Sequence, residues 1–385
     1  MHQANSMEII LLASIVSFVI AFVSIPVVIK IADAKKLFDH PGDRKIHYTP
    51  VPSLGGIGIF AAVSFTVTSF VSFKYNPEIQ YFLSSAIIIF FLGLKDDILL
   101  ISPIKKFTGQ LIAAFLLSYQ GHFQLTSLHG FLGIHELHPA LSTLFTYLTL
   151  LVIINAFNLI DGVDGLAGML GLISTLFFGV IFTIEKQTAF AILSFSMAGS
   201  LMAFLIFNFS PARIFMGDTG SLLLGLVNAV LAIKFINLES NAASTSIVFT
   251  AAPAVAFAAL FIPLIDTLRV TVIRTYYGRS PFDPDTNHIH HILLKRGLSH
   301  IQITGILSLA SILFLAVAIF LQPMGITAVI FFIIGLAVLL ISTLVWASST
   351  EKHTLGSEVP LKSSKPNIFR KYFSRFSTTS SEVNN

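Results

Sequence analysis

The sequence contains no cysteine and few charged residues, and both absences restrict what the protein can be. Without cysteine, disulfide bonds and thiolate metal sites are excluded. Charged residues make up 11% of the chain, whereas a soluble domain has about 25%. Hydrophobic residues make up 55%, and the mean hydropathy is +0.85. We therefore expect an integral membrane protein.

The sequence also lacks the alternating segments of about ten residues that are typical of a transmembrane β-barrel. Its apolar stretches are interrupted by glycine, proline and paired charges, which favours a helical bundle. We find no internal repeat and no P-loop pattern GxxxxGK[ST], so ATP binding of that type is not expected. The predicted fold is an all-α polytopic membrane protein.

We predict eleven transmembrane helices from the apolar stretches. The third, fourth and fifth are near the minimum of about 17 residues for a crossing helix. The first is too long, and too poor in preceding positive charge, to be a cleaved signal peptide. The predicted spans cover residues 9–32, 53–73, 80–95, 107–121, 139–155, 165–184, 188–208, 217–236, 247–268, 302–321 and 325–347.

The basic residues predict how these helices are oriented. An odd number of crossings places the two ends of the chain on opposite sides of the membrane. Of the 23 Lys and Arg residues, all but Lys74, Lys186 and Lys234 fall on the side of the C-terminus. Because cytoplasmic loops are rich in Lys and Arg, we predict a cytoplasmic C-terminus and an N-terminus outside. The pI of 9.2 is then mainly a topology signal, and nucleic-acid binding is not expected.

The acidic residues separate in a similar way. Glutamate occurs on the predicted outer side and in the C-terminal tail, whereas every aspartate falls on the predicted cytoplasmic side or at a helix end near it. Generic solvation would not separate two such similar side chains. Short carboxylates held close to the backbone suit Mg²⁺, which binds oxygen ligands in tight octahedral geometry. The pattern therefore indicates a magnesium site on the cytoplasmic side.

The chain divides into one membrane domain and a tail. Residues 1–347 carry all the predicted spans, and we expect them to form an integral membrane catalytic domain. Residues 348–385 are rich in Ser, Thr, Lys and Asn and are predicted to be a disordered cytoplasmic tail. Arg370, Lys371 and Arg375 in this tail would suit contact with anionic lipid.

Four polar clusters interrupt the apolar chain, and the predicted topology brings all of them to one side. Ionisable residues at the ends of membrane helices are costly and by default mark a functional site. The first cluster is Asp96-Asp97, followed by Lys105 and Lys106. Adjacent carboxylates suit a metal ion but also a helix cap. The lysines suit contact with phosphate, but they could also be ordinary basic residues of a cytoplasmic loop. These alternatives stay open here.

The second cluster, Asn155-x-x-Asn158-x-x-Asp161-x-x-Asp164, repeats a polar residue at every third position. On a helix these side chains would share one face, and the neighbouring Gly162 allows a ligand to approach the backbone closely. The alternative is a glycine-broken loop whose Asp and Asn residues cap the next helix. We favour a binding site, because the four polar groups interrupt an otherwise apolar span.

The third cluster runs from Asn208 through Phe215 to Gly-Asp218-Thr-Gly-Ser221. A glycine-rich turn that enters a helix presents free N–H groups and the positive end of the helix dipole, which suits phosphate. The sequence GDTGS alone is a common turn, however. The cluster indicates a phosphate site only in combination with the others.

The fourth cluster is His288-Ile-His290-His291, preceded by Asp283 and Asp285. A bare histidine cluster would suggest a transition metal. With no cysteine and with aspartates nearby, phosphate contact or proton transfer fits better. Zinc and a purely structural role are the alternatives.

A further set of histidines lies in the predicted outer loop. We expect this set to be part of a solvated loop, with a metal site as the less favoured alternative. Its members are His122, His129, His135 and His138, with Glu136 among them.

In combination, these motifs resemble those of the polyprenyl-phosphate N-acetylhexosamine-1-phosphate transferases, glycosyltransferase family 4, which includes the WecA, TagO and MraY branches. The resemblance covers roughly residues 10–345. The HxHH form is closer to the WecA/TagO branch, because the MraY branch usually has three consecutive histidines and Ile289 interrupts them here. The matching segments are Arg44-Lys45-x-His47-x-x-Pro50-x-Pro52-x-x-Gly55-Gly56, Asp96-Asp97, Asn155 to Gly165, Phe215 to Ser221, Asp266-Thr-x-Arg269 and His288 to His291.

The resemblance implies a reaction in which a polyprenyl phosphate attacks the β-phosphorus of a UDP-amino sugar and UMP is released, with Mg²⁺ required and Mn²⁺ a possible substitute. The implied partners are UDP-N-acetylglucosamine or a related donor, undecaprenyl phosphate and membrane lipid, with a homodimer possible. The implied place is the bacterial plasma (inner) membrane, with the active site on the cytoplasmic face. Phosphoryl transfer depends chiefly on positioning and charge neutralisation, which agrees with clustered carboxylates, lysines and histidines.

The resemblance also implies roles for single residues. The residues expected to be catalytic are Asp96, Asp97, Asp161 and His290. Magnesium is expected at Asp97 and Asp218. The residues expected to bind substrate are Lys45, Lys106, Asn155, Asn158, Asp164, Asn208, Phe215, His288 and His291. Whether any aspartate acts as a base stays open, because a phosphate monoester is already largely ionised near pH 7.

Three other functions compete with this one. An MraY-like phospho-MurNAc-pentapeptide transferase would share most of the motifs. A membrane transporter would also place ionisable groups in helices, but near the midplane, whereas here they gather at one boundary. A CDP-alcohol phosphotransferase would have Ala-Arg soon after its first Asp-Gly, and the segment after Asp164 lacks that arginine.

Overall fold

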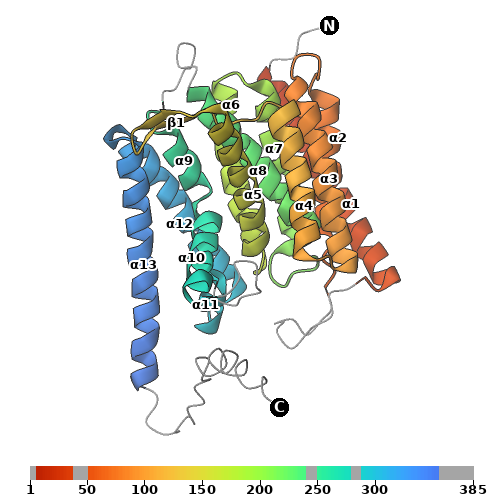
Figure 1. Cartoon of the computed structure of the whole chain (residues 1–385). Helices are drawn as coiled ribbons and strands as arrows, with labels where there is room; N and C mark the ends of the chain where they lie inside the picture. Colours follow the sequence, from red (N-terminus) through yellow and green to blue (C-terminus); the bar gives the residue numbers. More distant parts are fainter. Residues whose placement is uncertain (1–5, 38–50, 240–248, 279–287, 355–385) are drawn as a thin grey trace, which may run out of the picture. The chain divides into compact units, whose positions relative to one another are not determined.

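The computed structural model describes residues 6–37, 51–239, 249–278 and 288–354, and nearly all of its regular structure is α-helix (Figure 1). Lys45, Asp283, Asp285 and the end of the tail, residues 355–385, lie outside the described residues. The predictions made for them are therefore not tested by the structure.

The described chain forms a series of helices and one pair of strands. A π-helical turn, Leu116–Gln120, continues α4, and a 3-10 turn, Gln322–Met324, lies between α12 and α13. The elements are α1 (Ser6–Lys35), α2 (Gly55–Phe70), α3 (Pro77–Leu99), α4 (Pro103–Phe115), β1 (Ser127–Phe131), β2 (Ile134–Glu136), α5 (Pro139–Ile160), α6 (Leu166–Ile184), α7 (Thr188–Asn208), α8 (Gly217–Glu239), α9 (Ala252–Ala259), α10 (Phe261–Tyr276), α11 (Ile289–Lys295), α12 (His300–Leu321) and α13 (Ile326–Thr354).

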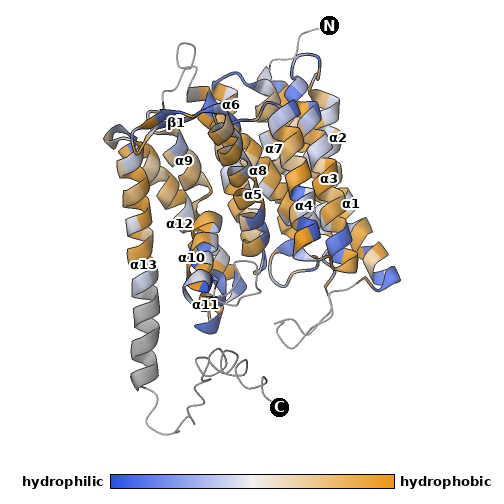
Figure 2. Cartoon of the chain, in the orientation of Figure 1, coloured by the Kyte–Doolittle hydropathy of each residue, from blue (hydrophilic) through white to orange (hydrophobic). Residues whose placement is uncertain are grey.

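Within the described residues, six helices are long and apolar enough to cross a membrane, or seven if α9 and α10 count as one bent span. Two shorter apolar helices are Gly55–Phe70 and Ile326–Leu340. Figure 2 shows hydrophobic residues along the middle of the helices and hydrophilic residues towards their ends. The prediction of a helical, multi-pass membrane protein is confirmed. Each predicted span overlaps a helix, and the number of crossings stays a prediction.

The span predicted at 247–268 is wrong as a single helix. The chain breaks at Leu260, and α9 and α10 meet at an angle of 81°. Pro263 lies in the first turn of α10, and a proline ring clashes with the carbonyl four residues earlier, so α9 cannot continue through it. The break also determines the direction of α10, which carries Asp266 to within 2.9 Å of His288.

The fold is also not entirely α-helical, because the predicted outer loop contains a β-hairpin. β1 and β2 pair antiparallel, with Ser127 opposite Glu136. Gly133, with φ +81°, lies in the turn between them, in a conformation that glycine adopts without steric cost. The Leu132 N–H donates to the Thr327 hydroxyl at 3.0 Å, which fastens the hairpin to the start of α13. The loop thus contains regular structure that the sequence analysis did not predict.

The core is formed by α7 and α8. Most of their residues are buried, whereas most of α1 faces outward. The helices α1, α2 and α6 pack on α7, and α3 and α5 pack on α8. Fully buried phenylalanines such as Phe178, Phe182 and Phe235 fill the space between α6 and α8. The first turn of α8 is consequently surrounded by the ends of other helices.

Glycines let three helices approach one another at this turn. A Cβ on Gly56 of α2 would overlap the backbone nitrogen of Gly220, and one on Gly93 of α3 would lie 2.5 Å from the Cα of Thr219. No side chain fits at either point. The backbones of α2 and α3 therefore contact that of α8 directly.

We expect Gly56→Ala to destabilise the fold by about 1–3 kcal/mol, because the added methyl group meets the backbone of α8. The thermal midpoint of the purified protein in detergent measures this effect. Gly335→Ala is the matched control, since nothing lies within 4 Å of a Cβ built there. Equal midpoints for the two variants would contradict the packing.

Candidate active site

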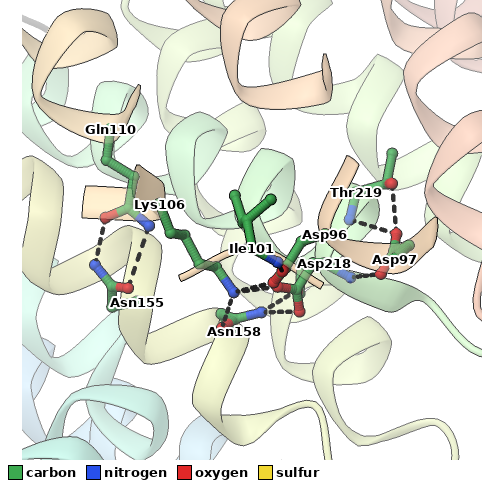
Figure 3. A network of polar contacts seen from close by, with 10 residues as sticks. Asp96, Asp97, Ile101, Lys106, Gln110, Asn155, Asn158, Asp218 and Thr219 are labelled. Carbon is green, nitrogen blue, oxygen red and sulfur yellow. Dashed lines mark hydrogen bonds and ion pairs between the residues drawn. The ribbon is translucent and has the colours of Figure 1, made fainter. Parts of the chain in front are cut away.

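The first turn of α8 is held in place by Asp97, from the end of α3. Gly217 has φ +69°, and a Cβ there would overlap the Ser53 carbonyl oxygen, so the turn requires glycine. The Asp218 N–H donates to Asp97 Oδ1 at 2.7 Å, and the Thr219 N–H donates to Oδ2 at 2.9 Å. The Thr219 hydroxyl donates to the same Oδ2 at 2.5 Å (Figure 3). Asp97 therefore caps the N-terminus of α8.

This cap bears on the roles predicted for Asp97. Both of its carboxylate oxygens accept hydrogen bonds from the chain, and its charge stabilises the positive end of the α8 dipole. The structure thus gives Asp97 a positioning function towards Asp218. Its predicted roles in catalysis and magnesium binding stay predictions.

Lys106 lies among oxygen atoms from three helices. Its Nζ is 3.1 Å from Asp96 Oδ2 of α3 and 3.3 Å from Asn158 Oδ1 of α5, and it forms an ion pair with Asp218 of α8 (Figure 3). Asp96 also accepts a hydrogen bond from the Ile101 N–H at 2.6 Å. Two carboxylates and an amide oxygen thus surround one positive charge, which is the environment that a cation site requires.

The two asparagines of α5 have different partners. The Asn158 Nδ2 donates to Asp218 Oδ1 at 2.7 Å and to Ser221 Oγ at 2.9 Å, which places it in the carboxylate cluster. Asn155 instead forms two hydrogen bonds with Gln110 of α4, at 2.7 and 3.2 Å (Figure 3). Gln110 lies one turn after Lys106, so this amide pair sets the distance between the lysine and α5. Both asparagines were predicted to bind substrate, and only Asn158 lies among the charged groups.

The loop before α8 is tied to two other segments. Asn208 accepts from the Gly165 N–H at 2.8 Å and donates to the Ile214 carbonyl at 2.9 Å. Each end of its buried amide therefore forms one hydrogen bond with the chain, and the substrate role predicted for Asn208 stays a prediction. Phe215 donates its N–H to the Pro52 carbonyl at 2.8 Å and accepts from the Gly55 N–H at 2.9 Å. The substrate role predicted for its half-buried side chain stays a prediction.

The histidine segment reaches the acidic turn after α5. The His288 Nδ1 lies 2.9 Å from Asp266 Oδ2, and the Ile289 N–H donates to Asp266 Oδ1 at 2.7 Å. The next histidine, His290, packs so closely against Gly162 that a Cβ on that glycine would overlap the His290 Nε2. The ring centroids of His290 and His291 are 4.3 Å apart. The bend before α10 thus brings the fourth cluster to the second.

The titration of two groups at this turn reflects their surroundings. Burial lowers the pKa of His290 to about 3, so its ring is neutral near pH 7. Burial, together with the charges of Asp218, Asp97 and Asp164, raises the pKa of Asp161 to about 8. Asp161 therefore lies within electrostatic range of the carboxylate cluster, and its carboxyl group is mostly protonated near pH 7.

Comparison with known proteins agrees with the family that the motifs resemble. A family model described as glycosyl transferase family 4 matches residues 79–236. The undecaprenyl-phosphate alpha-N-acetylglucosaminyl 1-phosphate transferase of Escherichia coli (strain K12) is 30% identical over 297 residues, covering 75% of this chain and 78% of the relative. The decaprenyl-phosphate N-acetylglucosaminephosphotransferase of Mycobacterium leprae (strain TN) is 32% identical over 311 residues, with the same coverage.

This chain belongs to glycosyl transferase family 4. The family predicted from the motifs is confirmed. The matched residues of the family model contain the aspartate pair and the first turn of α8, but they end before the histidine segment. In this member of glycosyl transferase family 4, the tertiary structure brings the predicted histidine segment against Gly162 of the acidic turn.

The residues at the cluster fit the metal that the family implies. In the part of the chain that the structure describes, no three His, Asp or Glu side chains are placed to hold a metal ion by themselves. Mg²⁺ commonly uses one or two carboxylates together with substrate phosphates. Asp218, with Asp96 and Asn158 beside it, suits this mode, since these oxygens already surround the Lys106 ammonium.

Three residues at the site had no role assigned from the sequence. Gln110 fixes Asn155, Asp266 holds His288, and His300 lies 3.2 Å from Asp164. Gln110 could have been noticed one helical turn after Lys106, and Asp266 lies in a family motif. Nothing in the sequence connects His300 with Asp164, because 136 residues separate them.

We expect Lys106→Met to lower the thermal midpoint, because Asp96 and Asp218 lose the cation between them. With partly exposed groups the cost is roughly 1–3 kcal/mol. Added Mg²⁺ should raise the midpoint of this variant more than that of the wild type. Lys105→Met is the control, since Lys105 is exposed. Identical responses to Mg²⁺ in both variants would contradict a cation site at Lys106.

Proposed function

We propose that this protein transfers N-acetylglucosamine 1-phosphate from UDP-N-acetylglucosamine to a polyprenyl phosphate such as undecaprenyl phosphate, as the first membrane step of cell-envelope polysaccharide synthesis. The observation that carries the proposal is the cluster of Asp96, Asp218 and Asn158 around the ammonium group of Lys106, at the end of apolar helices. The relatives whose names contain this activity support it.

In the proposed reaction, a phosphate oxygen of the lipid attacks the β-phosphorus of the donor. A new P–O bond forms as the bond between that phosphorus and the bridging oxygen of UMP breaks, and UMP leaves. The nucleophile is already largely ionised near pH 7, so the site needs no general base. It must position two anions and offset their charge, which Lys106 and the N-terminus of α8 can do.

The proposed cofactor is Mg²⁺, with Mn²⁺ as a possible substitute. Asp218 would hold it, with Asp96 and Asn158 beside it, and Asp97 would act at least through the first turn of α8. When bound, the metal would neutralise charge on the diphosphate of the donor. Without it, the carboxylates would repel both substrates.

The two substrates would approach from different directions. The lipid phosphate belongs near Asp96 and Lys106, where exposed apolar residues such as Leu100 lie beside the charged groups. The nucleotide belongs near Asp161, Asp164 and the histidine segment, where the chain offers polar side chains and a glycine-lined turn. The β-phosphorus of the donor would then lie between Lys106 on one side and the acidic turn with the histidine segment on the other.

The proposed setting is the bacterial inner membrane, with eleven crossings, the N-terminus outside and the site on the cytoplasmic face. The distribution of Lys and Arg supports this orientation. A cytoplasmic site would also meet a soluble nucleotide sugar directly. A homodimer is compatible with the proposal and is not required by it.

We expect purified protein in detergent to release UMP from UDP-N-acetylglucosamine when undecaprenyl phosphate and Mg²⁺ are present. A panel of UDP-amino sugars measures the donor preference, and omission of the lipid is the control. Turnover with UDP-MurNAc-pentapeptide alone would move the protein to the MraY branch. No UMP from any donor, in well-folded protein, would favour a transporter.

Asp97→Asn and Asp218→Asn are each expected to abolish this turnover in protein that still folds, because each removes a negative charge from the cluster and retains the side-chain shape. UMP release and the thermal midpoint measure activity and folding separately. His122→Ala and His135→Ala, in the outer loop, are expected to leave activity nearly unchanged. Substantial activity in either aspartate variant would contradict its assignment.

A further inference from the structure

The segment from α11 to α12 contacts the acidic turn after α5 at two points. His290 packs against Gly162, as described above. Ten residues later, His300 lies with its Nδ1 3.2 Å from Asp164 Oδ1. The two ends of this segment therefore hold the same short turn, and only the first belongs to the histidine motif.

Asp164 is held by more than one group of α12. The Thr304 hydroxyl donates to the Asp164 carbonyl at 2.9 Å, and the Asp164 N–H lies 3.3 Å from the His300 Nδ1. His300 and Thr304 are four residues apart and so share one face of the helix. Both the backbone and the carboxylate of Asp164 are thereby fixed to α12.

His300 and Asp164 are largely removed from water, and burying such polar side chains costs free energy unless they bond each other or a ligand. The side chains of His300 and Asp164 are 12% and 2% exposed. A buried carboxylate needs a charged or hydrogen-bonding partner, and the His300 Nδ1 is that partner in the tautomer or charge state in which it carries a proton. Without that proton, Nδ1 accepts from the Asp164 N–H instead. Removing one member of such a pair leaves the other buried without its partner, which perturbs its position and also destabilises the fold.

The start of α12 is itself well defined. The Ser299 side chain accepts from the Gln302 N–H, and the Gln302 side chain accepts from the Ser299 N–H, which is a capping box. His300 is therefore the first residue of the helix, and the capping box fixes the position of its backbone. The hydrogen bonds of this cap involve only residues of α12 and its cap, and none from the acidic turn.

We propose that His300 is a positioning residue that orients Asp164 for the nucleotide of the donor. This inference rests on the proposed function, which places the nucleotide at this turn. His300 acts through Asp164 and does not touch the reacting phosphates. Its effect therefore falls on binding of the donor and not on the lipid or on the chemical step.

His300→Ala is expected to raise the KM for UDP-N-acetylglucosamine at least about tenfold, while kcat and the KM for undecaprenyl phosphate change little, because uniform binding is lost. His300→Asn should restore most of the affinity, since its Nδ2 can occupy the place of the histidine Nδ1. Thr304→Val should raise the same KM by a smaller factor. Titration with UMP measures nucleotide binding directly.

Ser299→Ala is the matched control, because it weakens the cap of α12 without removing a contact to Asp164. It should lower the thermal midpoint, and it should raise the KM for the donor far less than His300→Ala does, because the contacts of His300 and Thr304 with Asp164 remain. An unchanged donor KM in His300→Ala, or an equal change for both substrates, would overturn the proposal. If wild-type protein neither binds UMP nor releases it from UDP-N-acetylglucosamine, the proposed function itself is wrong. That result is distinguishable from failure of the His300 proposal, in which the wild type is active and His300→Ala has the same donor KM.

Discussion

Asp97 joins the end of α3 to the first turn of α8 by accepting hydrogen bonds from the amides of Asp218 and Thr219. This cap decides where α8 begins and therefore where Asp218 lies. The close backbone contacts at Gly56 and Gly93 hold the same turn from two further sides. A helix N-terminus also carries partial positive charge, so the constraint is electrostatic as well as steric.

The charges around this turn require balance, because the site lies at the end of apolar helices. Lys106 supplies one positive charge between Asp96 and Asp218. Burial, together with the neighbouring carboxylates, raises the pKa of Asp161 to about 8, so the cluster resists a further negative charge. A site of this kind favours ligands that bring cations with them, such as a nucleotide diphosphate with magnesium. The negative charge that makes the cluster costly is the same charge that suits it to the proposed magnesium ion.

The site is assembled from two parts of the fold. The helices α3, α4, α5 and α8 form the carboxylate part, whereas α10, α11 and α12 bring the histidines. The break at Leu260 connects them, because it turns α10 so that Asp266 can hold His288. The acidic turn between α5 and α6 links the two parts, because it directly follows the last turn of α5, which carries Asn158, and because its own Gly162 and Asp164 contact the histidines.

The sequence by itself determined the membrane class, the helices and the family, because hydropathy and local motifs are encoded in neighbouring residues. It also singled out the aspartates and histidines that the structure brings together. It did not reveal the break before Pro263, the β-hairpin, or the partners Gln110 and His300, since these depend on contacts between distant segments. Whether an aspartate caps a helix or faces a ligand is decided by the backbone amides that approach it, and only the tertiary structure places those amides.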